Sequence, residues 1–314
     1  MDQDELPGIP NGWFAVAWSH ALSKAEVQRI NYFEEEMVLF RTRSGQARVL
    51  SAFCPHLGAH IGEGGRVVGE AVRCPFHAWQ FDGETGDCVS IPYCERIPSK
   101  AKLRAWDVIE RNGMIFVWHH AEQKPPDWEV PEIPQLRDPD WSEPETFEIE
   151  LPVHMQDMAE NNLDPVHFQV VHSMFAVPAT EIEIAADGRF MHAVSYVDQE
   201  TPAGKIKMEL HRDSWGLGLS SVESRGIPGA GLYMFSSTTP IDQHNTISRW
   251  SMTCTNNMVD LVGAEWFSAL KKGVEDDIQI WSNKIHRSTP VFCEGDKLLS
   301  EFRRWCTQFY SPAD

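Results

Sequence analysis

Four residues in the first third of the chain have the types and the spacing of metal ligands. Cys54-Pro-His56 is followed, after 17 further residues, by Cys74-Pro-Phe-His77. Each of two loops rich in Pro and Gly therefore presents one Cys and one His. Thiolate and imidazole are the ligands that zinc and iron prefer in proteins.

Two kinds of metal centre fit this group, and a third interpretation needs no metal. A structural zinc site can take two Cys and two His, and Cys and His can also be ordinary buried residues. In a Rieske [2Fe–2S] cluster, one iron takes two Cys and the other takes two His. This division explains best why each loop supplies one residue of each kind, with Cys54 and Cys74 on one iron and His56 and His77 on the other. On this count His60 is a spare loop residue.

A second group of candidate ligands lies near the middle of the chain. The segment Glu160-Asn-Asn-Leu-Asp164-Pro-Val-His167-Phe-Gln-Val-Val-His172 carries two His five positions apart. On a regular helix these two side chains point about 140° apart, so they reach one metal only where the helix is interrupted. Asp164-Pro165 provides the interruption, because Asp caps helix N-termini and Pro suits the first helical position. Two structural His are the alternative.

The third ligand should be a carboxylate, since two His and one carboxylate leave open positions on Fe(II) for O2. Glu275, Asp276 and Asp277 stand in a row in an amphipathic segment. At 100° per residue, only Asp277 falls on the apolar stripe that Leu270 and Val274 mark. A buried carboxylate needs a metal or a basic partner. We therefore expect Asp277 to join the two His, with an Arg or Lys partner as the alternative.

These motifs resemble one family. Cys-Pro-His-Leu-Gly-Ala-His at 54–60, with Cys-Pro-Phe-His-Ala-Trp at 74–79, is similar to the Rieske domain of the Rieske non-haem iron oxygenases. The catalytic domain of that family has Asp-x-x-His-x4-His and then a distant Asp on a helix. The resemblance implies His167, His172 and Asp277 as ligands of a mononuclear Fe(II). It also implies that Asp164 is the carboxylate that, in the family trimer, bridges a Rieske His of a neighbouring subunit to the iron site.

Softer motifs resemble the steroid branch of the family, which includes ketosteroid hydroxylase oxygenases and cholesterol desaturases. They are Asp277-Ile-Gln-Ile-Trp281-Ser-Asn-Lys284, Phe302-Arg-Arg-Trp305-Cys-Thr-Gln-Phe-Tyr310 and Ile91-Pro-Tyr93. The resemblance implies the oxygenase component of a monooxygenase, which uses O2 to hydroxylate or desaturate a steroid or sterol. A Rieske oxygenase for a small aromatic or other non-steroid compound is one alternative. A non-catalytic Rieske electron-transfer protein, without the second iron, is an alternative of another class.

A large substrate would need an apolar pocket in the second half of the chain. Leu217, Leu219, Leu232, Met234 and Phe235 are the candidates for its lining. The same residues could equally form ordinary core.

The chain has no recognisable nucleotide-binding motif. Gly62-Glu-Gly64-Gly65 lacks the third Gly of G-x-G-x-x-G at the required spacing. Electrons are therefore expected from NAD(P)H only indirectly, through a ferredoxin, a reductase or both. The place of Asp164, together with the resemblance, predicts a head-to-tail ring, a homotrimer in which the cluster of one subunit serves the iron of the next.

The elements that position these residues follow from the pattern around them. Residues 1–122 alternate short apolar runs with Gly, Asn and Pro turns, which predicts a small all-β domain. Residues 123–144 contain six prolines and are interpreted as a linker. Residues 145–314 place strands between helical segments at Met155–His172 and Asp260–Ile285. This order predicts a helix-grip-like domain with an antiparallel sheet and a long C-terminal helix, and an α+β fold class for the whole chain.

Composition excludes several other kinds of protein. The chain of 314 residues has 46 acidic against 27 basic residues and a formal charge of −19, which argues against binding to nucleic acid or anionic lipid. The longest uncharged stretch, Leu6–Ser23, contains Pro and Gly and is neither a signal peptide nor a membrane span. Seven Cys, an odd number, make a disulfide framework improbable and favour a reducing cytoplasm.

Overall fold

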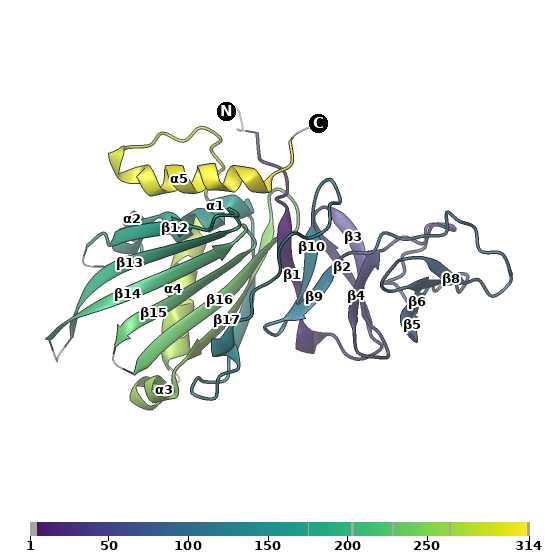
Figure 1. Cartoon of the computed structure of the whole chain (residues 1–314), viewed down its shortest axis with the longest axis horizontal. Coiled ribbons are helices and arrows are strands. Elements are labelled where there is room, and N and C mark those ends of the chain that lie inside the picture. The colour runs from purple at the N-terminus through teal and green to yellow at the C-terminus, as the bar shows by residue number, and fades with distance from the viewer. Residues whose placement is uncertain (1–4, 175, 202–203, 228, 264, 313–314) are drawn as a thin grey trace. The chain divides into compact units, whose positions relative to one another are not determined.

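The computed structural model describes residues 5–174, 176–201, 204–227, 229–263 and 265–312 (Figure 1). They form two compact units. One unit comprises Trp13–Val130, and the other comprises the residues up to Gly12 together with those from Pro131 onwards. The first is built from strands and the second from an antiparallel sheet with helices, so the predicted α+β class is confirmed.

The first unit contains three small antiparallel sheets, with strand orders β1-β10-β9, β2-β3-β4 and β5-β6-β7-β8. The apolar run Met37–Phe40 lies in the central strand of the second sheet and is fully buried, as expected for a strand covered on both faces. The strands are β1 (Gly12–Trp18), β2 (Val27–Tyr32), β3 (Glu35–Arg41), β4 (Ala47–Ser51), β5 (Arg66–Val68), β6 (Ala71–Arg73), β7 (Gln80–Asp82), β8 (Cys88–Ser90), β9 (Val108–Arg111) and β10 (Met114–His119).

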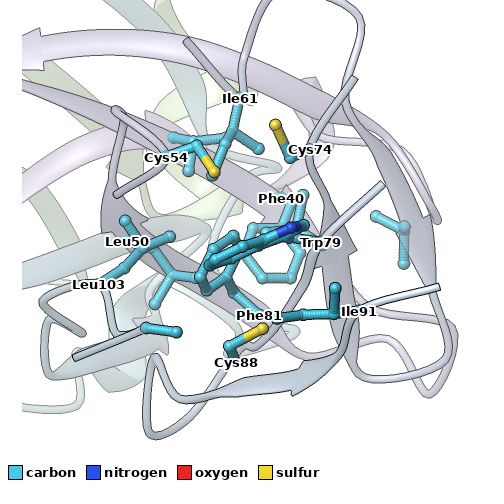
Figure 2. Close-up of a cluster of buried hydrophobic side chains, with 14 residues drawn as sticks. Phe40, Leu50, Cys54, Ile61, Cys74, Trp79, Phe81, Cys88, Ile91 and Leu103 are labelled. Carbon is cyan, nitrogen blue, oxygen red and sulfur yellow. The ribbon is translucent and has the colours of Figure 1, made fainter. Parts of the chain in front are cut away.

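One hydrophobic cluster of this unit lies directly beneath the two loops with the Cys and His motifs. Phe40, Leu50 and Phe81 form its centre and are fully buried. Figure 2 shows the sulfur atoms of Cys54 and Cys74 at one side of the cluster and that of Cys88 at the opposite side. The loops are therefore held against a packed core rather than hanging free in solvent.

The second unit is organised around one seven-stranded sheet of order β11-β17-β16-β15-β14-β13-β12. Each neighbouring pair is antiparallel. The strands are β11 (Glu145–Leu151), β12 (Ala179–Ile184), β13 (Phe190–Thr201), β14 (Gly204–Trp215), β15 (Leu219–Ile227), β16 (Ala230–Pro240) and β17 (Thr246–Cys254). The first strand thus lies beside the last, and the helices between β11 and β12 sit at one end of the sheet (Figure 1).

Among the described residues, the α-helices that accompany this sheet are α1 (Met155–Ala159), α2 (Pro165–Val170), α3 (Asn256–Val262), α4 (Glu265–Trp281) and α5 (Lys297–Cys306). Helix α4 crosses one face of the sheet (Figure 1). The single helix predicted at Asp260–Ile285 was wrong at both ends. Gly263, with φ 64°, ends α3 in the backbone region that favours glycine, and α4 stops at Trp281. Helix α5 was not predicted.

The observed division differs from the expected boundaries at 122 and 144, because the proline-rich segment packs by its two ends onto different units. In its first part, the backbone oxygen of Trp128 accepts a hydrogen bond from Trp13 Nε1 at 2.7 Å. In its second part, Ser142 N donates to Cys254 O at 2.7 Å. The residues before β1 join the second unit, where Asn11 N donates to Phe309 O at 2.7 Å.

Candidate functional site

The two Cys and His loops of the first unit have the same backbone design. In each loop the Cys N–H donates to the carbonyl five residues later, Cys54 to Ala59 at 2.9 Å and Cys74 to Trp79 at 2.8 Å. The residue before that carbonyl has a positive φ in both loops, 74° at Gly58 and 61° at Ala78. The turn needs the left-handed conformation, which Gly adopts freely and Ala only with strain. Two equivalent turns thus present two equivalent pairs of side chains.

The four candidate cluster ligands lie where metal ligands would be expected to lie. Cys54 and Cys74 are each 2% exposed, and burial, the largest cause, raises the pKa of the Cys54 thiol to about 11. The rings of His56 and His77 are 4.6 Å apart. His56 Nδ1 is buried with no hydrogen-bond partner among the described residues. A buried imidazole nitrogen without a partner, beside two buried thiols, fits a metal cluster and is costly without one.

Two aromatic residues support this arrangement, and their role in it is not directly visible in the sequence. Trp79 stacks on His56 with ring centres 4.7 Å apart and planes within 10°. Its Nε1 donates to the Tyr93 hydroxyl at 2.7 Å. Trp79 and Tyr93 both lie in motifs quoted above only for their resemblance. Here they fix the orientation of the His56 ring.

The other polar candidates near the loops have partners of their own. His60 Nδ1 accepts from Gly62 N at 3.1 Å, and its Nε2 lies 3.3 Å from Glu36 Oε2. Cys88 is buried and Cys94 is exposed, and all seven Cys of the chain are free thiols. His60 therefore serves its own loop, and no disulfide links the cysteines.

In the second unit, the structure brings His167, His172 and Asp277 together. Each offers one ligand atom, and these atoms all lie within 4.8 Å of one another. His172 Nε2 is 3.4 Å from Asp277 Oδ2, and the two His rings are 5.1 Å apart. Burial, the largest cause, lowers the pKa of His167, which favours the neutral imidazole that binds metals. Two imidazoles and one carboxylate in this arrangement fit a non-haem Fe(II) site.

The helix interruption that the sequence predicted allows the two His to converge. Asp164 caps α2, with Oδ1 accepting from Val166 N at 3.0 Å and His167 N at 3.2 Å, and Pro165 occupies the first helical position. His172 lies beyond the end of α2 at Val170. The directions of the two His side chains are therefore not set by the 100° rotation per residue of one helix.

Asp164 contacts the second ring nitrogen of His167 through its main chain and not through its carboxylate. His167 Nδ1 donates to the backbone oxygen of Asp164 at 2.5 Å, whereas the carboxylate Oδ2 is 4.0 Å away. The reason is that the carboxylate is already engaged as the helix cap. Asp164 thus orients His167 through its main chain, leaving Nε2 for the group with Asp277.

The three consecutive acidic residues of α4 have very different surroundings. Asp277 is 6% exposed, whereas Glu275 is exposed and Asp276 pairs with Lys272 on the outer side. The helical period therefore turns one carboxylate of the three toward the sheet.

A cavity of about 310 Å³ lies beside this group, which is within the range of ligand-binding pockets. Leu217, Leu232 and Met234 line it as expected, but the prediction for Leu219 and Phe235 was wrong. Successive residues of a strand point to opposite faces, so Phe235 faces away when Met234 faces in. Among the residues that line it, only His167, His172 and Asp277 are ionisable. The remaining walls are contributed by apolar side chains and by Ser, Thr, Asn and Gly.

A network of buried charges holds the segments that carry the three candidate ligands. Asp157 and Glu160 precede α2, and both are less than a tenth exposed. Lys284, just after α4, lies 3.2 Å from Glu160 Oε2, and Arg303 of α5 lies 2.7 Å from Glu160 Oε1. Lys284 and Arg303 belong to the motifs quoted above for their resemblance to the steroid branch. Their partners lie more than a hundred positions away, so the sequence did not reveal the pairing.

His154, Asp157 and His286 form a second group with ligand atoms within 4.8 Å of one another. His286 Nδ1 lies 3.0 Å from Asp157 Oδ2. His154 Nδ1 accepts from Gln156 N at 3.3 Å, and the His154 ring also hydrogen-bonds to the backbone near Pro7. These groups already serve as partners for one another, so we regard them as part of the buried network and not as a metal site.

Comparisons with known proteins find a matching family for each part of the chain. Residues 12–101 match the Rieske [2Fe-2S] domain, and residues 117–310 match the 3-Ketosteroid 9alpha-hydroxylase C-terminal domain. Cholesterol 7-desaturase nvd 1 of Ciona intestinalis is 30% identical, over 98% of this chain and 70% of the relative. The 3-ketosteroid-9-alpha-monooxygenase oxygenase component of Rhodococcus rhodochrous is 28% identical, over 95% of this chain and 79% of the relative.

Solved structures share the fold at low identity. NdmA of Pseudomonas putida CBB5, as a QL mutant with caffeine, has a TM-score of 0.78 and 20% identity, covering 94% of this chain and 89% of that one. Dicamba monooxygenase bound to 3,6-dichlorosalicylic acid has a TM-score of 0.76 and 18% identity, covering 96% of this chain and 98% of that one. Within the described part of the chain, no helix has both the length and the apolar character to cross a bilayer.

Proposed function

This chain belongs to the Rieske oxygenases that carry a 3-ketosteroid 9alpha-hydroxylase C-terminal domain, and on that premise we propose that it is the oxygenase component of a monooxygenase for a neutral steroid or sterol. Hydroxylation and desaturation are both within the chemistry of such a centre. The observation that carries the proposal is the apolar cavity beside His167, His172 and Asp277, whose described lining residues include no Lys or Arg.

The residues that would hold the two cofactors are those that the geometry groups. Cys54 and Cys74 would hold one iron of the [2Fe–2S] cluster, and His56 and His77 the other. The other group of two His and one Asp would hold the mononuclear Fe(II). When bound, these centres supply electrons and the activation of O2 for attack on an unactivated C–H bond.

The protein supplies orientation, exclusion of water and the shape of the cavity. The backbone oxygen of Asp164 fixes the tautomer of His167 by accepting its Nδ1 proton. Val274 and Leu270 of α4, together with Leu210 and Val222 of the sheet, give the substrate apolar walls. A C–H bond of the substrate then lies beside the ligand group, in a space from which the substrate has displaced water.

The charge of the cavity distinguishes between the candidate substrates. A buried carboxylate, such as that of an aromatic acid, needs a cationic partner. No Lys or Arg is among the described residues that line the cavity. The buried guanidinium of Arg212 lies over the Phe168 ring at 5.0 Å, but Arg212 is not one of the lining residues. A neutral substrate is therefore favoured, in agreement with the sterol and ketosteroid named for the two relatives in sequence.

Electrons would come from a ferredoxin or a reductase as a separate partner, since this chain carries no recognisable nucleotide-binding motif. We also propose a homotrimeric ring, in which the Asp164 carboxylate of one subunit meets the cluster of its neighbour. That carboxylate is 27% exposed, so an incoming His can still reach it while it caps α2.

A binding and turnover screen tests the proposal. The reconstituted protein, with a surrogate ferredoxin and reductase, is given cholesterol, 3-ketosteroids and aromatic acids under O2. We expect a steroid or sterol to be bound and oxidised, and aromatic acids to bind at least tenfold more weakly. Turnover of an aromatic acid, with every steroid inert, would contradict the assignment.

A further inference from the structure

Two buried indole N–H groups on the walls of the cavity have no hydrogen-bond partner. Trp281, at the end of α4, and Trp250, in β17, both line the cavity. Nε1 of each is buried and finds no acceptor within the described part of the chain. Buried N–H groups in folded proteins are nearly always bonded, and leaving one unpaired is destabilising. Because both side chains line the cavity, a group bound there is the candidate acceptor for these donors.

Several other polar groups on the same walls have partners within the protein. Ser220 and Ser236 bond to each other at 2.8 Å, and Thr238 bonds to Ser248 at 3.0 Å. Trp305, which is similarly buried in the same unit but away from the cavity, gives its Nε1 proton to Gly188 O at 2.7 Å. These hydroxyls therefore bond to one another, whereas the two indole N–H groups have no acceptor among the described residues.

Trp281 is the better placed of the two donors. It is 3% exposed and stands one helical turn after Asp277 on the same stripe of α4, so it belongs to the wall that carries a candidate iron ligand. The ring of Trp250 is partly exposed and stacks flat on Phe147, with ring centres 6.1 Å apart and planes within 4°. A donor at Trp281 can fix the position of a substrate relative to the ligand group.

We propose that Trp281 is a specificity-determining residue whose indole N–H donates a hydrogen bond to an oxygen atom of the substrate; this inference rests on the proposed function. A hydroxyl or carbonyl oxygen of the substrate gives the N–H an acceptor. A hydrocarbon analogue that fills the same space leaves the donor unpaired. The preferred substrate is thus a neutral polycyclic compound with an oxygen that Trp281 can reach.

Binding to the holoenzyme, measured by calorimetry without O2 or reductant, tests this role without turnover. The probes are androst-4-ene-3,17-dione and its two analogues that lack either the 3-oxygen or the 17-oxygen. We expect one analogue to bind wild type about 3- to 10-fold more weakly than the dione, as for the loss of one hydrogen bond. Trp281→Phe should bind the dione only as tightly as wild type binds that analogue. Its affinity for the analogue should equal that of wild type.

Trp266→Phe is the matched control, because Trp266 is buried in the same helix but does not line the cavity. Trp266→Phe should still bind the dione more tightly than the analogue. The visible spectrum of the cluster verifies that each variant is folded. Equal affinity of wild type for the dione and both analogues would overturn the assignment, even if Trp281→Phe failed to fold. A preference that survives in Trp281→Phe, or that Trp250→Phe removes instead, would overturn it too. Failure of all three probes to bind would count against the steroid function itself.

Discussion

Asp276 and Asp277 are adjacent in the chain, yet their carboxylates lie in opposite environments. Asp277 is buried 3.4 Å from His172 Nε2, while Asp276 pairs with Lys272 at the surface. Asp277→Ala should remove the mononuclear iron and leave the cluster in place, because the two groups of ligands belong to different units. Asp276→Ala should keep both the cluster and the mononuclear iron, and it should change the free energy of unfolding by less than about 1 kcal/mol.

Iron analysis per chain, with the visible spectrum of the cluster as reference, measures both variants of α4. Loss of one iron from Asp276→Ala, with none lost from Asp277→Ala, would show that the wrong face of the helix has been assigned.

His154 makes the protein sensitive to acid. Burial, the largest cause, lowers its pKa from 6.5 to about 4, against the opposing charge of Asp157 and alongside the like charge of a protonated His286. The unfolded chain therefore takes up a proton near pH 6.5, and the folded protein only near pH 4. Stability should fall by about 3 kcal/mol as the pH drops through this window. Protonation at Nδ1 would also end the hydrogen bond from Gln156 N.

His154→Asn removes this titration and keeps a side chain that can cap α1. Urea unfolding at pH 7 and pH 4.5 should show a smaller acid-induced loss of stability in the variant than in wild type. Parallel pH dependence of the two proteins would exclude His154 as the cause.

At the scale of elements, the start of α2 combines a structural and a functional task in one residue. The Asp164 carboxylate caps the helix, and its backbone oxygen orients His167. Asp164→Asn should keep the cap and both cofactors, because Asn caps as well as Asp, but it should slow electron transfer between the two centres by removing the charge. Asp164→Ala should lower the free energy of unfolding by about 1 kcal/mol more than Asp164→Asn does, because it removes the helix cap. It should also weaken binding of the mononuclear iron.

Single-turnover mixing of the reduced protein with O2 and substrate separates these effects, with iron content measured on the same samples. Asp164→Asn with wild-type transfer rates would restrict Asp164 to the role of a helix cap.

Local patterns could be predicted from the sequence, whereas contacts between distant segments could not. The interruption at Asp164-Pro165 follows from cap and proline chemistry, and the buried position of Asp277 follows from helical period. The break at Gly263 is not evident from the pattern, because helices with apolar residues lie on both sides of it. The pairing of Glu160 with Arg303 and the open indole of Trp281 depend on tertiary packing, which one sequence does not display.

At the scale of the whole molecule, the proposed ring makes each subunit depend on its neighbour. A chain without the cluster, Cys54→Ser, and a chain without the mononuclear site, His167→Ala, should each be inactive alone. Mixed rings should regain part of the activity, because the intact cluster of one chain can serve the intact iron site of the other. Turnover after subunit exchange measures this rescue, with unmixed samples of each variant as controls. A fully active monomer by light scattering would exclude the ring.

The order of strands in the large sheet has a consequence for how the protein is made. The first strand, β11, pairs only with the last, β17, about a hundred positions later, and α4 follows after that. A ribosome must therefore deliver nearly the whole chain before β11 finds its neighbour and Asp277 meets His167 and His172. The two loops of the first unit, in contrast, are complete early. Nascent chains should thus be able to accept the iron–sulfur cluster well before they can hold the oxygen-activating metal, which delays reactive chemistry until the walls around it have closed.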